Sequence, residues 1–264
     1  MRLFTVDAFT KIPFEGNPAG VCVLGTPFTD ETSYIKIAQE INYAETAFVY
    51  PKGENYHLRW FTPTTEIKLC GHATLATAKI LFEKFNYSGT IIHFETLSGL
   101  LSVKKENDLL VMNFPMEIAE KVATISPEIH SFINQTPKAV LKNKEWHIVH
   151  LNNEEAVKNF KPNFSSISDK PLLVVVTASS DDKTYDFVSR VFAPYYGISE
   201  DPVTGSAHCY LASYWSKQLQ KNTLIGHQVS KRTGVVSCEV LQNNRILLKG
   251  NAVIMSELLI EWKL

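Results

Sequence analysis

The chain has 264 residues, 45% hydrophobic and 20% charged, which suits one large domain or two modest ones and excludes a disordered or fibrous protein. Its formal net charge of -1 argues against nucleic acid or an anionic membrane as a partner. The four cysteines are scattered without a CxxC pair, and "MRLFTVDAFT" lacks an apolar signal core, so we expect a cytoplasmic protein.

The first half predicts short strands and two helices. "TDETSYIKIAQEIN" begins with Thr29 and Asp30 as cap candidates and has apolar residues at helical spacing, and "HATLATAKILFEKF" predicts a second, strongly apolar helix. Alternating or apolar runs bounded by turn residues predict the strands. The expected strands span residues 2–10, 16–24, 45–50, 56–62, 90–96, 99–105 and 109–114.

The pattern restarts after Pro115, again with short strands and one strongly apolar helix, "AHCYLASYWSKQL". Shorter helices are expected around "SPEIHSFIN" and "NEEAVKNF". The expected strands span residues 138–142, 145–151, 171–177, 185–192, 227–232, 234–241, 244–250 and 252–262. The order is typical of an α+β fold, because it lacks the regular βα alternation of a doubly wound sheet.

The two halves share a short repeat. "RWFTP" at 59–63 and "RVFAP" at 190–194 both read Arg-x-Phe-x-Pro, and Cys70 and Asp201 each stand seven residues after the proline. Each is followed by a glycine that is expected to open an Ala-rich helix, with three extra residues between Asp201 and its glycine. The repeat favours a duplication, and the alternative is two unrelated units with similar turn chemistry.

A duplication of this kind predicts a two-sided acid/base site. Free N–H groups at the start of a helix bind anions, and glycine allows a ligand close to the backbone. Two such helix starts would hold a small carboxylate in a shared cleft. Cys70 and Asp201 on opposite sides could then remove and return a proton.

A series of motifs resembles the PhzF family of phenazine biosynthesis-like proteins, which has the diaminopimelate epimerase fold. The motifs are "DAFT", "PFEGNPAGV", "AETAFV", "RWFTPTTEIKLCGHATLATA" and "FAPYYGISEDPVTGSAHC". The resemblance implies two similar domains, each a curved, mostly antiparallel sheet around a central helix. We expect the first domain to comprise residues 1–115 with about 252–264, and the second 116–251. The family resemblance also implies a homodimer that uses neither a metal nor an organic cofactor.

The resemblance also implies roles for individual residues. Glu45, of the "AET" motif, is the expected proton-transferring group, with a pKa raised by burial; His72 and Asp201 are expected to take part in catalysis. The substrate-binding candidates are Asn17, Gly71, Ala73, Thr74, Gly205, Ser206 and Ala207. Epimerases of this superfamily carry a cysteine at each helix start, whereas this chain has Cys70 at one and Asp201 at the other. That difference argues against a two-cysteine racemase.

The expected activity is a cofactor-independent isomerase that moves a proton between carbons of a small carboxylate. Two alternatives stay open: an epimerase with Cys70 and Asp201 as its proton-transfer pair, and a ligand-binding protein without turnover. Cys70 is a further candidate for chemistry, although a free cysteine is often a small buried hydrophobe. No metal is expected, because Cys70-x-His72 and His208-Cys209 lack zinc spacing and a third ligand is not apparent in the sequence.

Overall fold

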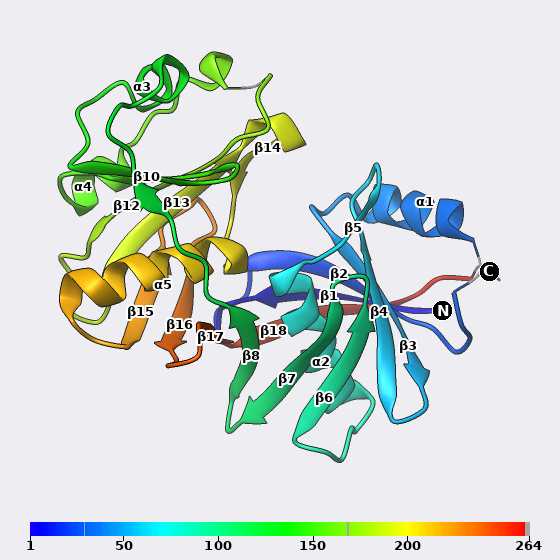
Figure 1. Ribbon diagram of the computed structural model, residues 1–264. Helices are drawn as coiled ribbons and strands as arrows, with labels where there is room; N and C mark the ends of the chain where they lie inside the picture. Colours follow the sequence, from blue (N-terminus) through cyan, green and yellow to red (C-terminus); the bar gives the residue numbers. More distant parts are fainter. Residues whose placement is uncertain (29, 168, 262–264) are drawn as a thin grey trace. The chain divides into compact units, whose positions relative to one another are not determined.

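The structure is a computed structural model that describes residues 1–28, 30–167 and 169–261 (Figure 1). The chain forms two compact units. Unit 1 comprises Met1–Asn113 and Lys249–Leu264, and unit 2 comprises Phe114–Leu248. The boundaries expected from the sequence, after residues 115 and 251, lie close to these. The C-terminal end of the chain therefore belongs to the same unit as the N-terminus.

Unit 1 is a mostly antiparallel set of strands with two helical crossovers. Strand β1 pairs antiparallel with β2 and with β18, β2 runs parallel to β3 across helix α1, and β4 runs parallel to β6 across helix α2. The pairs β3–β4, β4–β5, β6–β7 and β7–β8 are antiparallel. The bounds are β1 (Arg2–Ala8), β2 (Asn17–Val23), α1 (Glu31–Ile41), β3 (Thr46–Lys52), β4 (Asn55–Phe61), β5 (Glu66–Ile67), α2 (Gly71–Lys84), β6 (Ile91–Thr96), β7 (Gly99–Glu106), β8 (Leu109–Pro115) and β18 (Ala252–Leu259).

Unit 2 repeats this series of pairings. Strands β10 and β11 are antiparallel, β11 runs parallel to β12 across helix α4, and β13 runs parallel to β15 across helix α5. The pairs β9–β10, β12–β13, β13–β14 and β15–β16 are antiparallel. The bounds are β9 (Glu120–Lys121), α3 (Pro127–Ile133), β10 (Ala139–Asn143), β11 (Trp146–His150), α4 (Glu154–Lys158), β12 (Leu173–Ser179), β13 (Phe187–Ala193), β14 (Ile198–Asp201), α5 (Gly205–Leu219), β15 (Thr223–Gln228) and β16 (Gly234–Val240). Strand β17 (Arg245–Gly250) follows β16 along the chain.

The two units therefore have the same order of elements. Each has a hairpin, a crossover helix, a second hairpin, a short strand, a long helix and a further hairpin. In this order β1 corresponds to β10, β4 to β13, β5 to β14 and α2 to α5. The shared topology supports the duplication that the short sequence repeat predicts.

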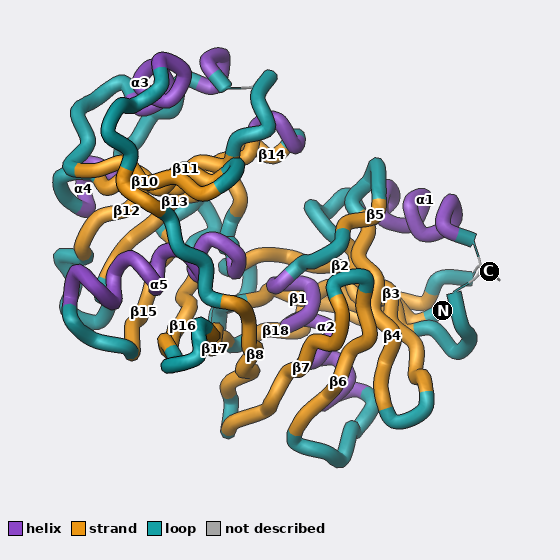
Figure 2. Tube along the Cα trace, viewed as in Figure 1, coloured by secondary structure: helices purple, strands orange, loops and turns teal. Residues whose placement is uncertain are grey.

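The long helices lie in the cores of their units. Of the α2 residues, all from His72 to Phe82 except Lys79 are buried, and α2 contacts β1, β2, β3, β7 and β18 (Figure 2). Helix α5 is similarly buried from Gly205 to Ser213 apart from Ser206, and it contacts β15 and β16. A helix that is apolar nearly all round needs this kind of enclosure. The Ala-rich sequences of both helices are explained by it.

Helix α1 begins as its sequence predicts. Asp30 is the N-cap, and its Oδ1 accepts a hydrogen bond of 3.1 Å from the backbone N–H of Thr32. Thr29, the other cap candidate, lies outside the described residues, as does residue 262 at the end of the last predicted strand. No helix in the described part of the chain is long and apolar enough to cross a membrane.

One strand is displaced from its predicted place. The sequence predicts a strand over residues 227–232, whereas β15 spans Thr223–Gln228. Gly226 lies inside β15, where an added Cβ would come within 2.5 Å of the Phe187 ring and 2.9 Å of His208 Nε2. This glycine is therefore required by close packing inside a strand and does not mark a turn.

Candidate active site

Three reactive side chains meet at the start of α2 in unit 1. Glu45 directly precedes β3, Cys70 is the N-cap of α2, and His72 is in its first turn. His72 Nε2 lies 3.3 Å from Glu45 Oε2, and His72 Nδ1 lies 3.5 Å from Cys70 Sγ. The structure thus brings together the two residues expected to be catalytic in this half of the chain and the further candidate Cys70.

The histidine of this cluster is neutral at physiological pH. Burial lowers the pKa of His72 to about 4, because the charged ring would lose its hydration. A neutral ring with its proton on Nε2 can direct that N–H toward the Glu45 carboxylate and accept the Cys70 thiol proton at Nδ1. The Glu45 side chain is 12% exposed, so it is sheltered but still reachable. The arrangement links a thiol, an imidazole and a carboxylate in one short chain of polar contacts.

The other predicted residues of unit 1 lie on the same elements. Asn17 is the first residue of β2 and is fully buried. Gly71 opens α2, and Ala73 and Thr74 are buried in its first turn. The Thr74 hydroxyl donates a 2.6 Å hydrogen bond to the Cys70 carbonyl, so this side chain fixes the helix start.

Asp201 in unit 2 belongs to a hydrogen-bonded loop ahead of α5. It is the last residue of β14, and its carboxylate accepts a hydrogen bond from the Thr204 hydroxyl. Gln228 Nε2 donates to the Asp201 carbonyl at 2.7 Å, and Gln228 Oε1 accepts from the Thr204 N–H at 2.9 Å. The fully buried Gln228 therefore fixes both ends of the segment from Asp201 to Thr204.

Sequence reasoning missed Thr204 and Gln228. Gln228 is the last residue of β15 and follows Thr204 by 24 positions, so no local motif connects the two. Thr204 stands inside the "FAPYYGISEDPVTGSAHC" motif, but only the structure shows that its hydroxyl binds Asp201.

The remaining predicted residues of unit 2 form the first turn of α5. Gly205 opens the helix, Ser206 is exposed and Ala207 is buried. His208 Nδ1 donates a 2.8 Å hydrogen bond to the carbonyl of Thr204, the N-cap. Thr74 makes the same kind of bond to the N-cap carbonyl of α2.

The starts of α2 and α5 differ from those of the other α-helices in the described residues. Helices α1, α3 and α4 are each capped by a side-chain oxygen, from Asp30, Ser126 and Asn153. Cys70 and Thr204, the N-caps of α2 and α5, make no side-chain cap hydrogen bond. First-turn N–H groups without a side-chain cap are donors for an anion, and the helix dipole favours negative charge there.

The structure corrects one correspondence between the two halves. In unit 1 the Arg59 Nε donates to Glu66 of β5 at 2.6 Å, and in unit 2 the Arg190 Nε donates to Glu200 of β14 at 2.7 Å. Each glutamate precedes its helix N-cap by four residues, so Thr204, not Asp201, occupies the position of Cys70.

The three extra residues of unit 2 therefore lie before Glu200, where the chain forms a short 3₁₀ helix (Pro194–Tyr196) ending at Gly197. The sequence alone placed them after Asp201. Counting from the proline was wrong because the insertion follows the proline directly. Cys70 and Asp201 are consequently not a matched pair.

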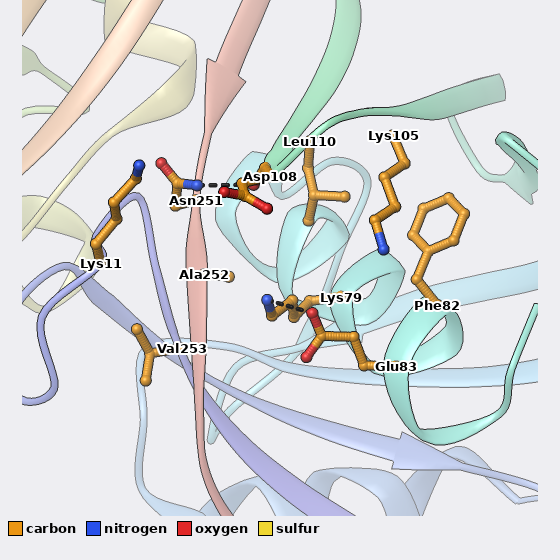
Figure 3. Close-up of a pocket in the computed structure, with 10 residues that line it drawn as sticks. All are labelled: Lys11, Lys79, Phe82, Glu83, Lys105, Asp108, Leu110, Asn251, Ala252 and Val253. Atoms are coloured by element: carbon orange, nitrogen blue, oxygen red, sulfur yellow. Dashed lines mark hydrogen bonds and ion pairs between the residues drawn. The ribbon is translucent and has the colours of Figure 1, made fainter.

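A separate pocket of about 260 Å³ lies elsewhere in unit 1, between α2, the β7–β8 turn and β18 (Figure 3). Among its lining residues, Lys79 pairs with Glu83 at 2.6 Å, and Lys11 and Lys105 contribute two further amino groups. None of the predicted site residues lines it. This pocket is therefore distinct from the Glu45–Cys70–His72 cluster.

Comparisons with known proteins agree with the fold and motifs. The sequence model of the phenazine biosynthesis-like (PhzC–PhzF) family matches residues 6–258. The chain is 42% identical over 262 residues to a protein of Halalkalibacterium halodurans named as an isomerase, and the match covers 98% of each. A crystal structure of a PhzC/PhzF protein from Clostridium difficile has a TM-score of 0.92 at 40% identity, over 99% of this chain and 100% of that one.

A more distant structure shows the fold alone. A hydroxyproline epimerase from Agrobacterium vitis superposes with a TM-score of 0.62 at 10% identity, over 97% of this chain and 91% of that one. The fold is thus the epimerase fold, and the class of protein is an isomerase. The chain belongs to the PhzC–PhzF family of phenazine biosynthesis-like proteins.

Proposed function

We propose that this protein is a cofactor-independent isomerase that moves a proton between two carbons of a small carboxylate, with Glu45 as the group that carries the proton. The observation that supports this most strongly is the contact of 3.3 Å between Glu45 Oε2 and His72 Nε2. A neutral imidazole N–H beside the carboxylate orients it without fixing a permanent positive charge next to it. The Glu45 carboxylate can therefore take up a proton from the substrate and release it again.

The proposed proton transfer has two steps. The Glu45 carboxylate removes a proton from one carbon of the substrate, and the electron pair of the broken C–H bond shifts the double bond. The protonated Glu45 then returns the proton to a second carbon, so nothing is gained or lost overall. A sheltered carboxylate that a substrate can still reach suits this role, because a general base must lie within hydrogen-bond reach of the proton that it removes.

We expect the carboxylate of the substrate to bind at the first turn of α2. Its N–H groups lack a side-chain cap, and Gly71 removes the side chain that would stand between ligand and backbone. The start of α5 offers the same features in unit 2, with Gly205 in the equivalent position. Asp201, held by Thr204 and Gln228, is proposed to orient the substrate or to stabilise developing charge.

The test is solvent exchange at carbon. A panel of small carboxylates is incubated with the protein in deuterium oxide, and NMR follows both deuterium incorporation and conversion. Glu45→Gln should lower the rate by about 10²–10⁴ while the substrate still binds, because only the proton-carrying group is removed. Glu40→Gln, on the exposed face of α1, is the matched control and should react like the wild type. Wild-type turnover by Glu45→Gln would overturn the proposal.

The same experiment distinguishes the two alternatives. An epimerase with Cys70 and Asp201 as its proton-transfer pair predicts deuterium at a stereocentre, lost in Cys70→Ser and retained in Glu45→Gln. The correspondence of Cys70 with Thr204 gives that alternative less support. A binding protein without turnover predicts a ligand-induced rise in melting temperature and no exchange. Under each of these hypotheses, the exchange rate and ligand binding of Asp201→Asn measure how much unit 2 contributes.

A further inference from the structure

The Glu45–Cys70–His72 cluster contains three kinds of metal ligand in one place. The ligating atoms of the carboxylate, the thiol and the imidazole all lie within 4.8 Å of one another. The sequence offers only the pair Cys70 and His72, because Glu45 precedes Cys70 by 25 positions. The third ligand becomes visible only when β3 and α2 are placed against each other in the folded unit.

One distance in the cluster, between the imidazole nitrogen and the carboxylate oxygen, equals that of a tetrahedral zinc site. Zinc bonds of about 2.0 Å to nitrogen and oxygen and about 2.3 Å to sulfur place N and O about 3.3 Å apart, and N and S about 3.5 Å apart. His72 Nε2 and Glu45 Oε2 are 3.3 Å apart. Cys70 Sγ lies 3.9 Å from His72 Nε2 and 3.5 Å from Nδ1, so the Cys70 side chain would have to turn toward Nε2 before its sulfur could share an ion with that nitrogen.

The charges of the three ligands suit a divalent ion. A carboxylate and a thiolate together carry two negative charges, and a neutral imidazole adds none, so a bound divalent cation leaves the cluster neutral. Neutrality matters because the Cys70 and His72 side chains are buried, and an uncompensated charge there is costly. Cys70 stands at the N-terminus of α2, where the helix dipole favours negative charge.

We propose that Glu45, Cys70 and His72 form a zinc-binding site whose occupation blocks proton transfer. Thiolate and imidazole are ligands that select zinc over magnesium or calcium. Binding displaces the thiol proton: Zn²⁺ and the Cys70 S–H give a zinc–thiolate bond and one H⁺, which leaves to solvent. The fourth position of the tetrahedron is left for water, and the partly exposed Glu45 gives the ion a way in.

The claim of inhibition rests on the proposed function, whereas the claim of binding does not. Zinc would occupy the carboxylate oxygen that the proposed reaction uses, so bound zinc and turnover exclude each other. Direct measurement of binding therefore separates the two ideas. Zinc that binds at this cluster without slowing turnover supports the metal site and overturns the catalytic role of Glu45.

The test is calorimetric titration of the full-length, metal-free protein with Zn²⁺, in two buffers of different ionisation enthalpy. We expect one zinc per chain and a proton release of up to one per zinc, which disappears in Cys70→Ser. Each of Cys70→Ser, His72→Gln and Glu45→Gln should weaken zinc binding by at least about 100-fold, because each removes a direct ligand. Mg²⁺ in place of zinc should give no measurable binding.

A matched control and a second probe keep the result interpretable. Cys209→Ser removes another buried thiol near a helix start, where the serine hydroxyl can still contact the Gly205 carbonyl, and it should bind zinc like the wild type. Co²⁺ added to the wild type should show thiolate-to-metal charge-transfer absorption in the near ultraviolet, a readout that needs no variant. Zinc binding by Cys70→Ser within tenfold of the wild type, equal affinity for Mg²⁺, or a cobalt spectrum without a thiolate band would each overturn the proposal.

Discussion

His72 and His208 are buried histidines at the starts of the two long helices. Burial lowers the pKa of each to about 4, from the 6.5 of an exposed imidazole. Both are therefore neutral at neutral pH, and each reaches the start of its helix through Nδ1: His72 to the Cys70 thiol, and His208 to the Thr204 carbonyl. Their neutrality ties the stability of the fold to pH.

The sign of this dependence follows from which state binds more protons. Between pH values of about 6.5 and about 4 the unfolded chain protonates these imidazoles and the native chain does not. The free energy of unfolding should therefore fall as the pH is lowered through that window. For His72, one pKa difference of this size contributes about 2 kcal/mol between about pH 7 and about pH 5.

Urea unfolding of the wild type and of His72→Gln at these two pH values measures the effect. The difference in the free energy of unfolding between the two pH values should be about 2 kcal/mol smaller in the variant, since glutamine does not titrate. His93→Gln, at an exposed position of β6, is the control and should keep the wild-type difference. Equal pH dependence in wild type and His72→Gln would show that the buried ring is not held neutral.

At the scale of elements, each repeated arginine connects two strands and a crossover helix. Arg59 bonds Glu66 of β5 and also Glu31 at the start of α1, and these hydrogen bonds, chiefly the one to Glu66, raise its pKa. Arg190 bonds Glu200 of β14 and donates to the carbonyls at the end of α4, including that of Lys158. The Arg-x-Phe-x-Pro repeat is therefore explained by architecture, since neither arginine belongs to the candidate site.

Double-mutant cycles test this shared role. Arg190→Met with Glu200→Gln, and Arg59→Met with Glu66→Gln, should each give a coupling energy of about 1–3 kcal/mol in urea unfolding, because both arginine side chains are mostly buried. The exposed pair Lys104 and Glu106 is the control, and its coupling should be smaller. A negligible coupling in one unit only would contradict the structural equivalence of the two pairs.

The sequence predicts the helices and strands better than it predicts which of them are equivalent in the two halves of the chain. Alternation and Ala-rich helical spacing locate most strands and both core helices, and the glycines at 71 and 205 mark the helix starts correctly. The insertion after Pro194 and the displaced strand β15 were not predictable, because both depend on contacts between distant residues. The same limit applies at the site. The motifs predict Glu45 and His72, whereas Gln228 and the three-ligand geometry emerge only from packing.

At the scale of the whole molecule, the chain closes unit 1 with its own end. Strand β18 pairs with β1 from Arg2, opposite Leu259, to Ala8, opposite Ala252, and it also contacts α2. The Thr5 and Ser256 hydroxyls share a 2.7 Å hydrogen bond across this pair. Unit 2 uses none of β18. The homodimer implied by the family resemblance stays a prediction, which light scattering on the purified protein would check.

This closure predicts that the two units differ in their need for the C-terminal end. A chain that stops at residue 251 lacks β18, so β1 gains an unpaired edge and one side of α2 loses its cover. Hydrogen exchange followed by mass spectrometry should then show fast exchange throughout unit 1 and slow exchange in the core strands of unit 2. A chain that stops at residue 261 keeps β18 and should exchange like the full-length protein. Protection retained in unit 1, or lost equally in both units, would contradict the division of the chain into one self-contained unit and one that depends on its C-terminal strand.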